Sequence, residues 1–141
     1  MMEPGEYFIG DLCYVMEADW DEFCAITMPE GKCLDGEFTL SDGRKFSFSR
    51  TAYGDGCYED QWGNSYDVDA GLIGCIKIKD IKPELPLDRI KTYGSIFTFA
   101  EPFEVEGSNS GDPWDGVIVI SNVYINTDSE DDTDMENEED E

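Results

Sequence analysis

Apolar and polar residues alternate along most of the chain from Tyr7 onward, and turn-forming residues separate the alternating runs at short intervals. The first run predicts a strand over residues 6–16 that is interrupted or bulged at Gly10-Asp11. The next predicts a hairpin, because Asp42-Gly43 supplies a turn in which a positive φ angle is needed. The apolar positions on its two arms are Phe38, Leu40, Phe46 and Phe48.

Three more short strands are predicted over residues 57–60, 65–69 and 72–78, where short runs of apolar and β-branched residues lie between turn signals. The first two of these runs are close enough in sequence to form a hairpin. Tyr58 and Tyr66 are expected to face each other across it, because directly opposed aromatic side chains stabilise antiparallel pairs.

The last third of the chain is also predicted to contain β-strands. Residues 95–107 resume the alternation and bend at Pro102. Residues 117–125, VIVISNVYI, are nearly all β-branched or apolar, which predicts one strand at the centre of a sheet or covered on both faces. Before them, residues 79–93 contain two prolines and a cluster of basic residues, and are interpreted as a connecting loop with at most one helical turn.

A single short helix is predicted near residues 20–28. Asp19 stands at its N-cap position and Glu22 follows three residues later, which is the capping-box pattern. With eight or nine short strands and this helix, the chain is predicted to be mainly β, or a β-dominated α+β domain. An antiparallel sandwich and a partly open barrel both fit, with the helix at one end or edge.

Charge divides the chain into two parts. The 141 residues carry a net charge of −25, and residues 126–141 contain ten acidic residues and no basic one. The other 24 acidic residues and all nine Lys and Arg leave residues 1–125 with a net charge of −15. We therefore expect a single β-rich domain over residues 1–125 and a disordered acidic tail over residues 126–141.

This negative charge narrows the classes of partner. A polyanionic surface repels nucleic-acid phosphates and anionic lipid headgroups, so direct binding to nucleic acid or to a membrane is disfavoured. The natural electrostatic partner is a basic protein surface. One hypothesis is therefore a non-enzymatic interaction protein that inhibits a nucleic-acid-binding protein by charge mimicry; the alternative is that the charge only keeps a small domain soluble. The oligomeric state is left open.

The five cysteines form no Cys-x-x-Cys pair, and their odd number argues against a disulfide framework. Reduced thiols that pack as small hydrophobic side chains are expected. The first residues are acidic where a secretory signal would be basic, and no apolar run is long enough to span a membrane. These features predict a cytoplasmic protein.

The stretch from Ala52 to Gly74 is rich in Asp, Gly and aromatic residues, and two interpretations of it stay open. In the first, it is a set of tight turns between strands. In the second, carboxylates at strand ends form a binding site for Ca²⁺, Mg²⁺, a sugar or another small molecule, with hydrolysis by paired carboxylates as a further possibility. The weak candidates for such a site are Asp11, Asp55, Asp67 and Asp69.

No standard catalytic group or cofactor is indicated. The chain has no histidine, which removes Ser-His-Asp and Cys-His catalysis, and it has no Gly-rich phosphate-binding loop. The Asp-rich stretch also fails the EF-hand spacing. No catalytic residue and no cofactor other than the weak Ca²⁺ or Mg²⁺ alternative is therefore predicted. The candidates for partner binding are the aromatic and acidic residues of two Gly/Asp-rich loops: Trp62, Asp112, Trp114 and Asp115.

The segments YFIGDLCYVM, WDEFC and TAYGDGCYEDQWGNSYDVDAGLIGCI resemble a family of small uncharacterised proteins from bacteria and their phages. The family has an IGD-CYV opening, a YGDG-Y element and a VD-G-IG element, and the resemblance covers residues 7–24 and 51–76. It implies a stand-alone intracellular β-rich domain and carries over no known activity. It also implies that the residues of these elements lie together: Asp11, Asp55, Asp67, Asp69 and Gly71.

Overall fold

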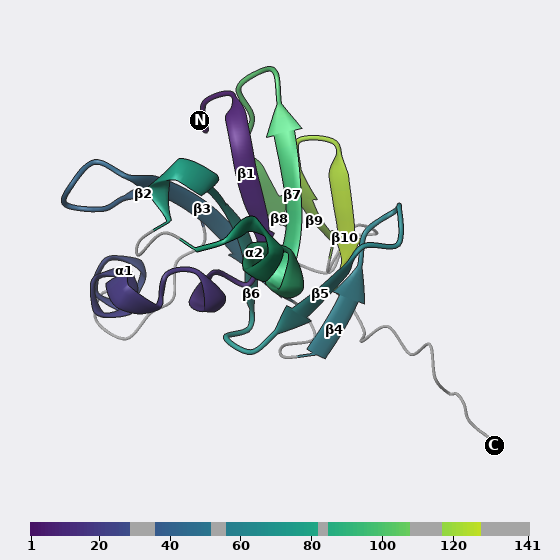
Figure 1. Cartoon of the computed structure of the whole chain (residues 1–141), viewed down its shortest axis with the longest axis horizontal. Coiled ribbons are helices and arrows are strands. Elements are labelled where there is room, and N and C mark those ends of the chain that lie inside the picture. Colours follow the sequence, from purple (N-terminus) through teal and green to yellow (C-terminus); the bar gives the residue numbers. More distant parts are fainter. Residues whose placement is uncertain (29–35, 52–55, 82–84, 108–116, 128–141) are drawn as a thin grey trace.

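In the computed structural model of the chain, residues 1–28, 36–51, 56–81, 85–107 and 117–127 are described. Within these residues the backbone forms three antiparallel sheets, two α-helices and three short 3-10 helices (Figure 1). The strands are β1 (Gly5–Gly10), β2 (Gly36–Thr39), β3 (Lys45–Arg50), β4 (Gly56–Glu59), β5 (Ser65–Val68), β6 (Leu72–Lys77), β7 (Gly94–Phe99), β8 (Val105–Gly107), β9 (Val117–Ile120) and β10 (Val123–Asn126). The helices are η1 (Leu12–Tyr14), η2 (Glu17–Asp19), α1 (Trp20–Thr27), η4 (Ile78–Asp80) and α2 (Leu87–Tyr93).

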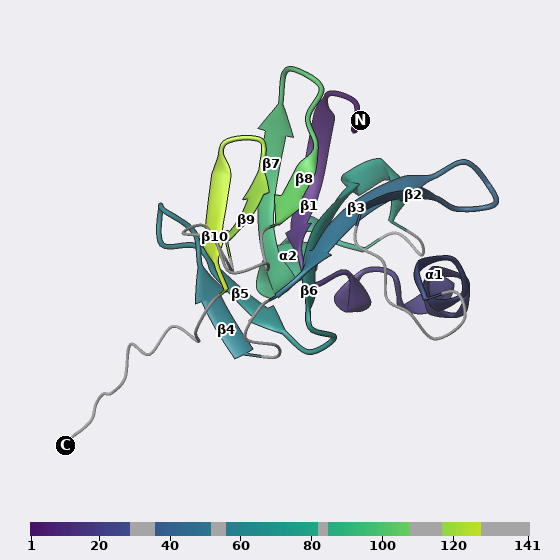
Figure 2. The ribbon, with the colours of Figure 1, turned by 180° about the vertical axis from the view of Figure 1, so that it is seen from behind.

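A five-stranded sheet with the order β2-β3-β6-β1-β7 forms the centre of the molecule. The helices cover one face of it (Figure 1). The three-stranded sheet β10-β9-β8 and the hairpin β4-β5 cover the other face, as the view from behind makes plain (Figure 2). The central sheet is thus sandwiched between a helical layer and a second β layer, and the sheets do not close into a barrel. The predicted mainly β, antiparallel sandwich with a short helix is confirmed.

Strand alternation divides the apolar residues between two cores. On β1, Tyr7 and Ile9 point toward the smaller sheets, while Phe8 points toward the helices. Burial of both faces explains why four consecutive residues of β1 and five of β6 are buried. The core under the smaller sheets also contains Tyr58, Tyr66, Val68, Ile73, Cys75, Ile118, Ile120, Val123 and Ile125. The core under the helices contains Leu12, Met16, Phe23, Phe46, Phe48, Leu72, Ile76 and Ile90.

Several local predictions are confirmed. Phe38 pairs with Phe46 in the β2-β3 hairpin, and Gly43 of its turn has a φ angle of 96°. Tyr58 and Tyr66 are directly opposed in the β4-β5 hairpin. The α1 helix starts at Trp20, at the predicted position. Alternation and turn signals in the sequence were therefore sufficient to predict the β2-β3 and β4-β5 hairpins.

The prediction of one strand over residues 117–125 is wrong. The segment forms two strands, β9 and β10, which turn at Ser121-Asn122 and pair with each other. Ser121 has a φ angle of 58°, a left-handed conformation that polar turn residues adopt more easily than β-branched ones. The polar pair Ser121-Asn122 was the turn signal. β9 does lie at the centre of a sheet, between β8 and β10.

The interpretation of residues 79–93 as a loop with at most one helical turn also needs correction, because α2 occupies Leu87–Tyr93. Pro86 stands at the N-cap of α2 with a φ angle of −61°. A proline at the start of a helix has a suitable φ angle and gives up no intrahelical hydrogen bond, since the first N–H groups of a helix have no partner. Ile90 then packs on the central sheet.

The capping-box hydrogen bonds predicted for α1 are absent, although Asp19 does occupy the N-cap position. Its carboxylate instead binds the guanidinium of Arg44 through two hydrogen bonds of 2.9 Å. The Glu22 carboxylate accepts from the backbone N–H of Ser41 at 2.6 Å. Both acidic residues thus connect the helix to the β2-β3 turn, because these tertiary donors compete with the local N–H groups.

Three glycines lie side by side across the central sheet, with Gly10 paired to Gly74 on one side and to Gly94 on the other. A Cβ atom at Gly74 would stand 2.2 Å from the Ser47 carbonyl oxygen and 2.5 Å from the Phe48 Cβ. Such contacts cannot be relieved by a side-chain rotation. The close approach of β3 and β6 therefore requires glycine at this position.

Replacement of Gly74 by alanine should lower the free energy of unfolding by about 2 kcal/mol, because overpacking forces the backbone of two central strands apart. Urea denaturation followed by far-UV circular dichroism measures this loss. Thr98→Ala, at an exposed position of β7, is the control and should change stability by no more than about 0.5 kcal/mol. Equal stability of Gly74→Ala and the native protein would show that β3 and β6 are not this close.

Candidate functional site

Asp11, the first predicted site residue, is fully buried at the end of β1. Its carboxylate accepts hydrogen bonds from the backbone N–H groups of Cys13 at 3.0 Å, Asp69 at 2.7 Å and Ala70 at 2.6 Å. The first of these caps η1, and the other two hold the turn between β5 and β6. Asp11 therefore connects two segments that are nearly sixty residues apart in sequence.

Asp69 lies beside Asp11 but its side chain faces solvent. Its carboxylate accepts a hydrogen bond from the Tyr14 hydroxyl, and the Tyr14 ring stacks on Tyr93 with 4.9 Å between ring centroids. Burial of the hydroxyl and its hydrogen bond to Asp69 raise the pKa of Tyr14. The hydroxyl therefore stays protonated at neutral pH and is the donor of this hydrogen bond. Arg89 donates to the Tyr93 hydroxyl at 3.2 Å, which extends the contact along α2.

The structure thus brings Asp11 and Asp69 together but gives them different surroundings. Asp67 is exposed on β5, opposite Cys57, and Asp55 lies outside the described residues. In the part of the chain that the structure describes, no group of three or more Asp, Glu or Cys side chains is gathered in the way that a metal ion requires. A cation or sugar site at the four aspartates stays a prediction.

The turn between β4 and β5 depends on Asp60, a residue that sequence reasoning did not single out. Asp60 is 7% exposed and accepts four hydrogen bonds, from the N–H groups of Trp62 and Asn64, the Asn64 side-chain amide and the Tyr66 hydroxyl. Burial alone would raise the pKa of Asp60, but these hydrogen bonds outweigh it and the pKa lies below its usual value. The available signal was the spacing Asp-x-x-Gly-Asn, which is typical of an Asx-type turn.

Gln61 attaches this turn to β10. Its side chain donates to the Asn122 carbonyl at 2.6 Å and accepts from the Tyr124 N–H at 2.8 Å. The two turns consequently lie side by side, although they are about sixty residues apart. Each carries a strongly exposed aromatic side chain: Trp62 is 55% exposed and Tyr124 is 51% exposed. Of the predicted partner-binding residues, Trp62 is thus accessible to a partner, whereas Asp112, Trp114 and Asp115 lie outside the described residues.

Tyr124 belongs to a partly apolar sheet face that points away from the core. Register places Glu106, Val119 and Tyr124 in one row across β8, β9 and β10, and their neighbours Ile118 and Ile120 point inward. Trp62 packs on Phe97 of β7, with 5.7 Å between ring centroids. We call the outward sheet residues Glu106, Val117, Val119 and Tyr124, together with Trp62 from the neighbouring β4-β5 turn, the aromatic face.

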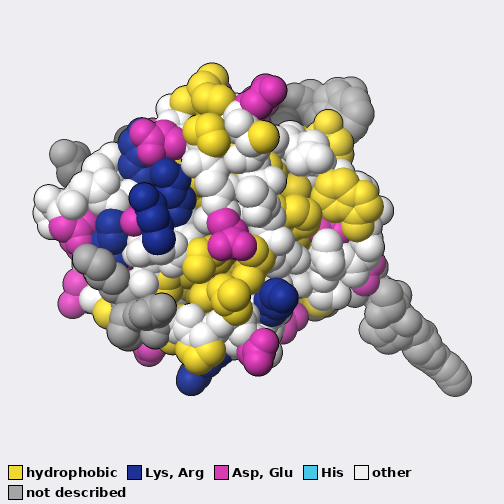
Figure 3. Space-filling view, turned by 45° about the horizontal axis from the view of Figure 1, so that its top comes forward, with side chains coloured by type: hydrophobic (Ala, Val, Ile, Leu, Met, Phe, Trp, Pro, Cys, Tyr) yellow, Lys and Arg dark blue, Asp and Glu magenta, His cyan; other side chains and the backbone are white. Residues whose placement is uncertain are grey.

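The basic residues gather elsewhere. Of the seven Lys and Arg in the described ranges, four line one cavity at the β2-β3 turn and the end of β6: Arg44, Lys45, Lys77 and Lys79. Figure 3 shows this cluster on the left of the molecule, while hydrophobic side chains gather on the right, where Figure 1 places the β4-β5 turn and β10. From the sequence, a basic cluster was located within residues 79–93. That Arg44 and Lys45, at the β2-β3 turn and the start of β3, lie with Lys77 and Lys79 was not predicted.

The cysteines of the described residues belong to no cluster of metal-ligating side chains. Among the described residues, Cys13, Cys24, Cys57 and Cys75 form no disulfide with one another, and Cys33 lies outside these residues. Cys75 is fully buried in the core under the smaller sheets, and burial raises its thiol pKa well above the usual value. Cys75 therefore packs as a small apolar side chain, as expected.

Fold and surface together define a mainly β protein with an antiparallel sandwich, a charged cavity and a separate aromatic face. No family model matches the chain, and neither a curated protein nor a solved structure is similar to it. The resemblance to small bacterial and phage proteins in residues 7–24 and 51–76 stays a prediction. Among the described helices, none has the length and apolar character needed to cross a membrane.

Proposed function

We propose that this protein is a non-enzymatic interaction protein that binds a basic protein surface, with its carboxylates in the place of nucleic-acid phosphates. The observation that carries this proposal is the uneven distribution of charge. The described residues contain 18 acidic and seven basic side chains, and four of the basic ones line a single cavity. The rest of this surface is left with a large excess of carboxylates, which favours a cationic partner.

The aromatic face supplies apolar surface that a partner can bury on binding. Carboxylates accelerate encounter and select partners by sign, and aromatic side chains that become buried at an interface add to the binding energy. Trp62 and Tyr124 are exposed and their backbones are fixed by Gln61 and Asp60, so little ordering is required on binding. Glu106 lies in the same row as Tyr124 and adds negative charge. An apolar centre with an acidic surround suits an Arg-rich or Lys-rich surface.

The test is retention of cellular proteins on the immobilised native chain, with the Trp62→Ala/Tyr124→Ala double variant alongside. Proteins retained in 0.1 M salt should be released near 0.5 M salt, where the Debye length is about 4–5 Å, and should be displaced by duplex DNA. The double variant should bind them at least about 30-fold more weakly, because interface aromatics are commonly hot spots.

Leu87→Ala is the matched control, since Leu87 is 49% exposed on α2. It should bind the retained proteins as tightly as the native chain. A chain that ends at Thr127 lacks most of the acidic tail and should associate more slowly while dissociating at a similar rate. Binding that survives 0.5 M salt, resists DNA, or is equally weakened by Leu87→Ala would overturn the proposal.

A further inference from the structure

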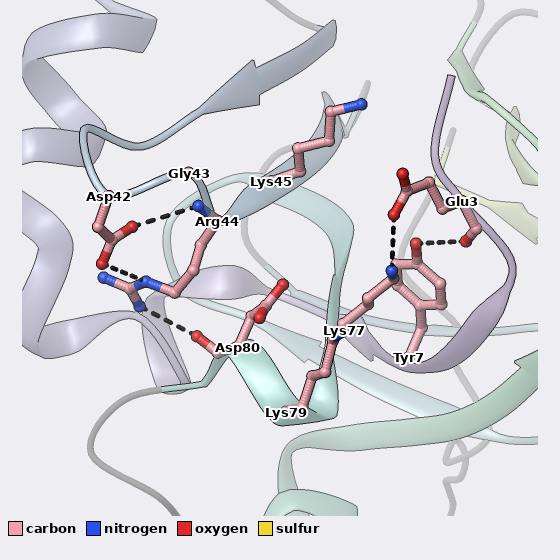
Figure 4. Close-up of a pocket in the computed structure, with 9 residues that line it drawn as sticks. All are labelled: Glu3, Tyr7, Asp42, Gly43, Arg44, Lys45, Lys77, Lys79 and Asp80. Atoms are coloured by element: carbon pink, nitrogen blue, oxygen red, sulfur yellow. Dashed lines mark hydrogen bonds and ion pairs between the residues drawn. The ribbon is translucent and has the colours of Figure 1, made fainter.

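The cavity that gathers the basic residues has a volume of about 330 Å³ and lies between the β2-β3 turn, the end of β6 and the first residues of the chain (Figure 4). Arg44 and Lys45 come from the start of β3, and Lys77 and Lys79 from the end of β6 and from η4. A neighbouring cavity of about 390 Å³ shares Lys77 and Lys79. The volume of the first cavity is at the lower end of the range for ligand sites.

Arg44 is part of the wall. Its guanidinium donates two hydrogen bonds to Asp19, one to Asp42 and one to the Asp80 carbonyl, all between 2.7 and 3.0 Å. These bonds use four of its five N–H groups, and the Asp19 pair raises the pKa of Arg44 further above its usual value. Arg44 therefore joins α1, β3 and η4 and gives the cavity a fixed shape.

Lys77 has a partner that a ligand can replace. Its ammonium pairs with the Glu3 carboxylate at 2.9 Å, but the Glu3 side chain is 69% exposed while that of Lys77 is only 16% exposed. An exposed carboxylate gains little from such a pair, because water and salt screen it. The cation is held in the cavity wall, and its anionic partner is free to turn toward solvent.

Two further cations face an incomplete set of carboxylates. Glu37 pairs with both the Lys45 ammonium at 3.1 Å and the amino terminus at 2.6 Å, so one negative charge serves two positive ones. Lys79 is exposed, and within the described residues no carboxylate lies within ion-pair distance of its ammonium. At the cavity edge around Lys45, Lys77 and Lys79 there are thus four positive groups, the amino terminus included, and three carboxylates, those of Glu3, Glu37 and Asp80, in a chain with a net charge of −25.

Asp80 places a negative charge in the same cavity as these positive charges. Its backbone carbonyl holds Arg44, while its carboxylate lines the same cavity and has no ion pair with a described residue. A ligand made only of negative charge would be repelled by it. A ligand with hydroxyl groups would donate hydrogen bonds to it, because an ionised carboxylate is a strong acceptor.

We propose that this cavity binds a small phosphorylated polyhydroxy compound, with the phosphate on Lys77 and Lys79 and a hydroxyl group on Asp80. Inorganic phosphate alone satisfies the first half of the site. A hexose phosphate satisfies both halves and fits the cavity volume. The site is separate from the aromatic face, so ligand binding and partner binding are independent activities of the molecule.

Isothermal titration with hexose 6-phosphate, inorganic phosphate and unphosphorylated hexose tests this assignment. Sodium chloride at matched ionic strength is the reference, because any salt screens the repulsion among carboxylates. The hexose phosphate should bind saturably, more tightly than phosphate, and the free hexose should not bind. Lys77→Met/Lys79→Ala should weaken binding at least about tenfold, since charge-assisted hydrogen bonds are lost. Arg89→Ala/Lys91→Ala removes two positive charges from α2 and should leave affinity unchanged.

The choice of methionine at position 77 and one further variant, Glu3→Gln, distinguish a specific loss of binding from a loss of folding. Methionine keeps the aliphatic stem of Lys77, which lies 3.4 Å from the position of a Cβ on Gly5. Glu3→Gln removes the competing carboxylate and should tighten binding severalfold, whereas a damaged fold would weaken it. Asp80→Asn should reduce the preference for hexose phosphate over phosphate. Heats equal to those of sodium chloride, or equal affinity in the Lys77→Met/Lys79→Ala and Arg89→Ala/Lys91→Ala variants, would overturn the proposal.

Discussion

Asp60→Ala should lower the free energy of unfolding by about 4 kcal/mol, the largest loss expected from a single substitution described here. The change leaves four hydrogen-bond donors without their acceptor, and one of them is the buried hydroxyl of Tyr66. Tyr66 also pairs with Tyr58 in the core under the smaller sheets, so the damage reaches beyond the turn. Urea denaturation of the purified variant measures the loss.

Asp60→Asn separates the charge from the shape of the side chain. Its carbonyl oxygen can still accept from the two backbone N–H groups, so about half of the loss is expected. Asp67→Ala, an exposed aspartate on the adjacent β5, is the matched control and should change stability by at most about 0.5 kcal/mol. If Asp67→Ala is as damaging as Asp60→Ala, the loss comes from net charge or strand propensity and not from the turn.

The same residue predicts a pH dependence. The folded pKa of Asp60 is lower than the ordinary value of 3.8, so its ionised form stabilises the native state. This contribution is complete above pH 3.8 and is lost as the pH falls through the lower folded value. The stability difference between the native protein and Asp60→Asn should therefore be constant near neutral pH and shrink below about pH 4. Comparing the two proteins cancels the titration of the other carboxylates.

Asp11→Ala should cost about 3 kcal/mol, because three backbone N–H groups lose the carboxylate that they share. The turn between β5 and β6 would then lose its bonds to the end of β1, but would keep those from Thr51 to the Gly71 carbonyl and from Tyr14 to Asp69. Native-state hydrogen exchange should show the largest acceleration at the Asp69 and Ala70 amides, while amides at the centre of β1 should speed up only as far as the overall loss of stability requires.

Asp69→Ala is the control for that experiment, since the exposed Asp69 carboxylate accepts a hydrogen bond from the Tyr14 hydroxyl, while the Asp69 backbone N–H still donates to Asp11. We expect a loss below about 1 kcal/mol. A loss equal to that of Asp11→Ala would mean that the Asp69 side chain contributes as much to stability as the three hydrogen bonds of Asp11, and it would contradict the assigned role of Asp11.

The two proposed activities occupy different parts of the surface and fail independently. Loss of partner retention in Trp62→Ala/Tyr124→Ala leaves the cavity intact, and Lys77→Met/Lys79→Ala leaves the aromatic face intact. Each variant is therefore a folding control for the other activity. A substitution that abolished both would indicate a general loss of structure.

The sequence by itself determined the β2-β3 and β4-β5 hairpins, because side chains alternate on a strand and turn residues fix the register. It therefore predicted the Tyr58–Tyr66 pair, the turn at Gly43 and the start of α1, and it also determined the acidic character of the chain. Two turn signals were misread: Ser121-Asn122 inside an apolar run, and Pro86 at the start of α2.

Only the tertiary structure decided which distant segments meet. The sheet order, the Asp11 contact with the β5-β6 turn and the Gln61 contact with β10 all join residues far apart in the chain. The same holds for the cavity, where Lys77 meets Arg44 and Glu3. Local alternation and turn preferences carry no information about such contacts, because they depend on how the sheets and helices pack around two shared cores.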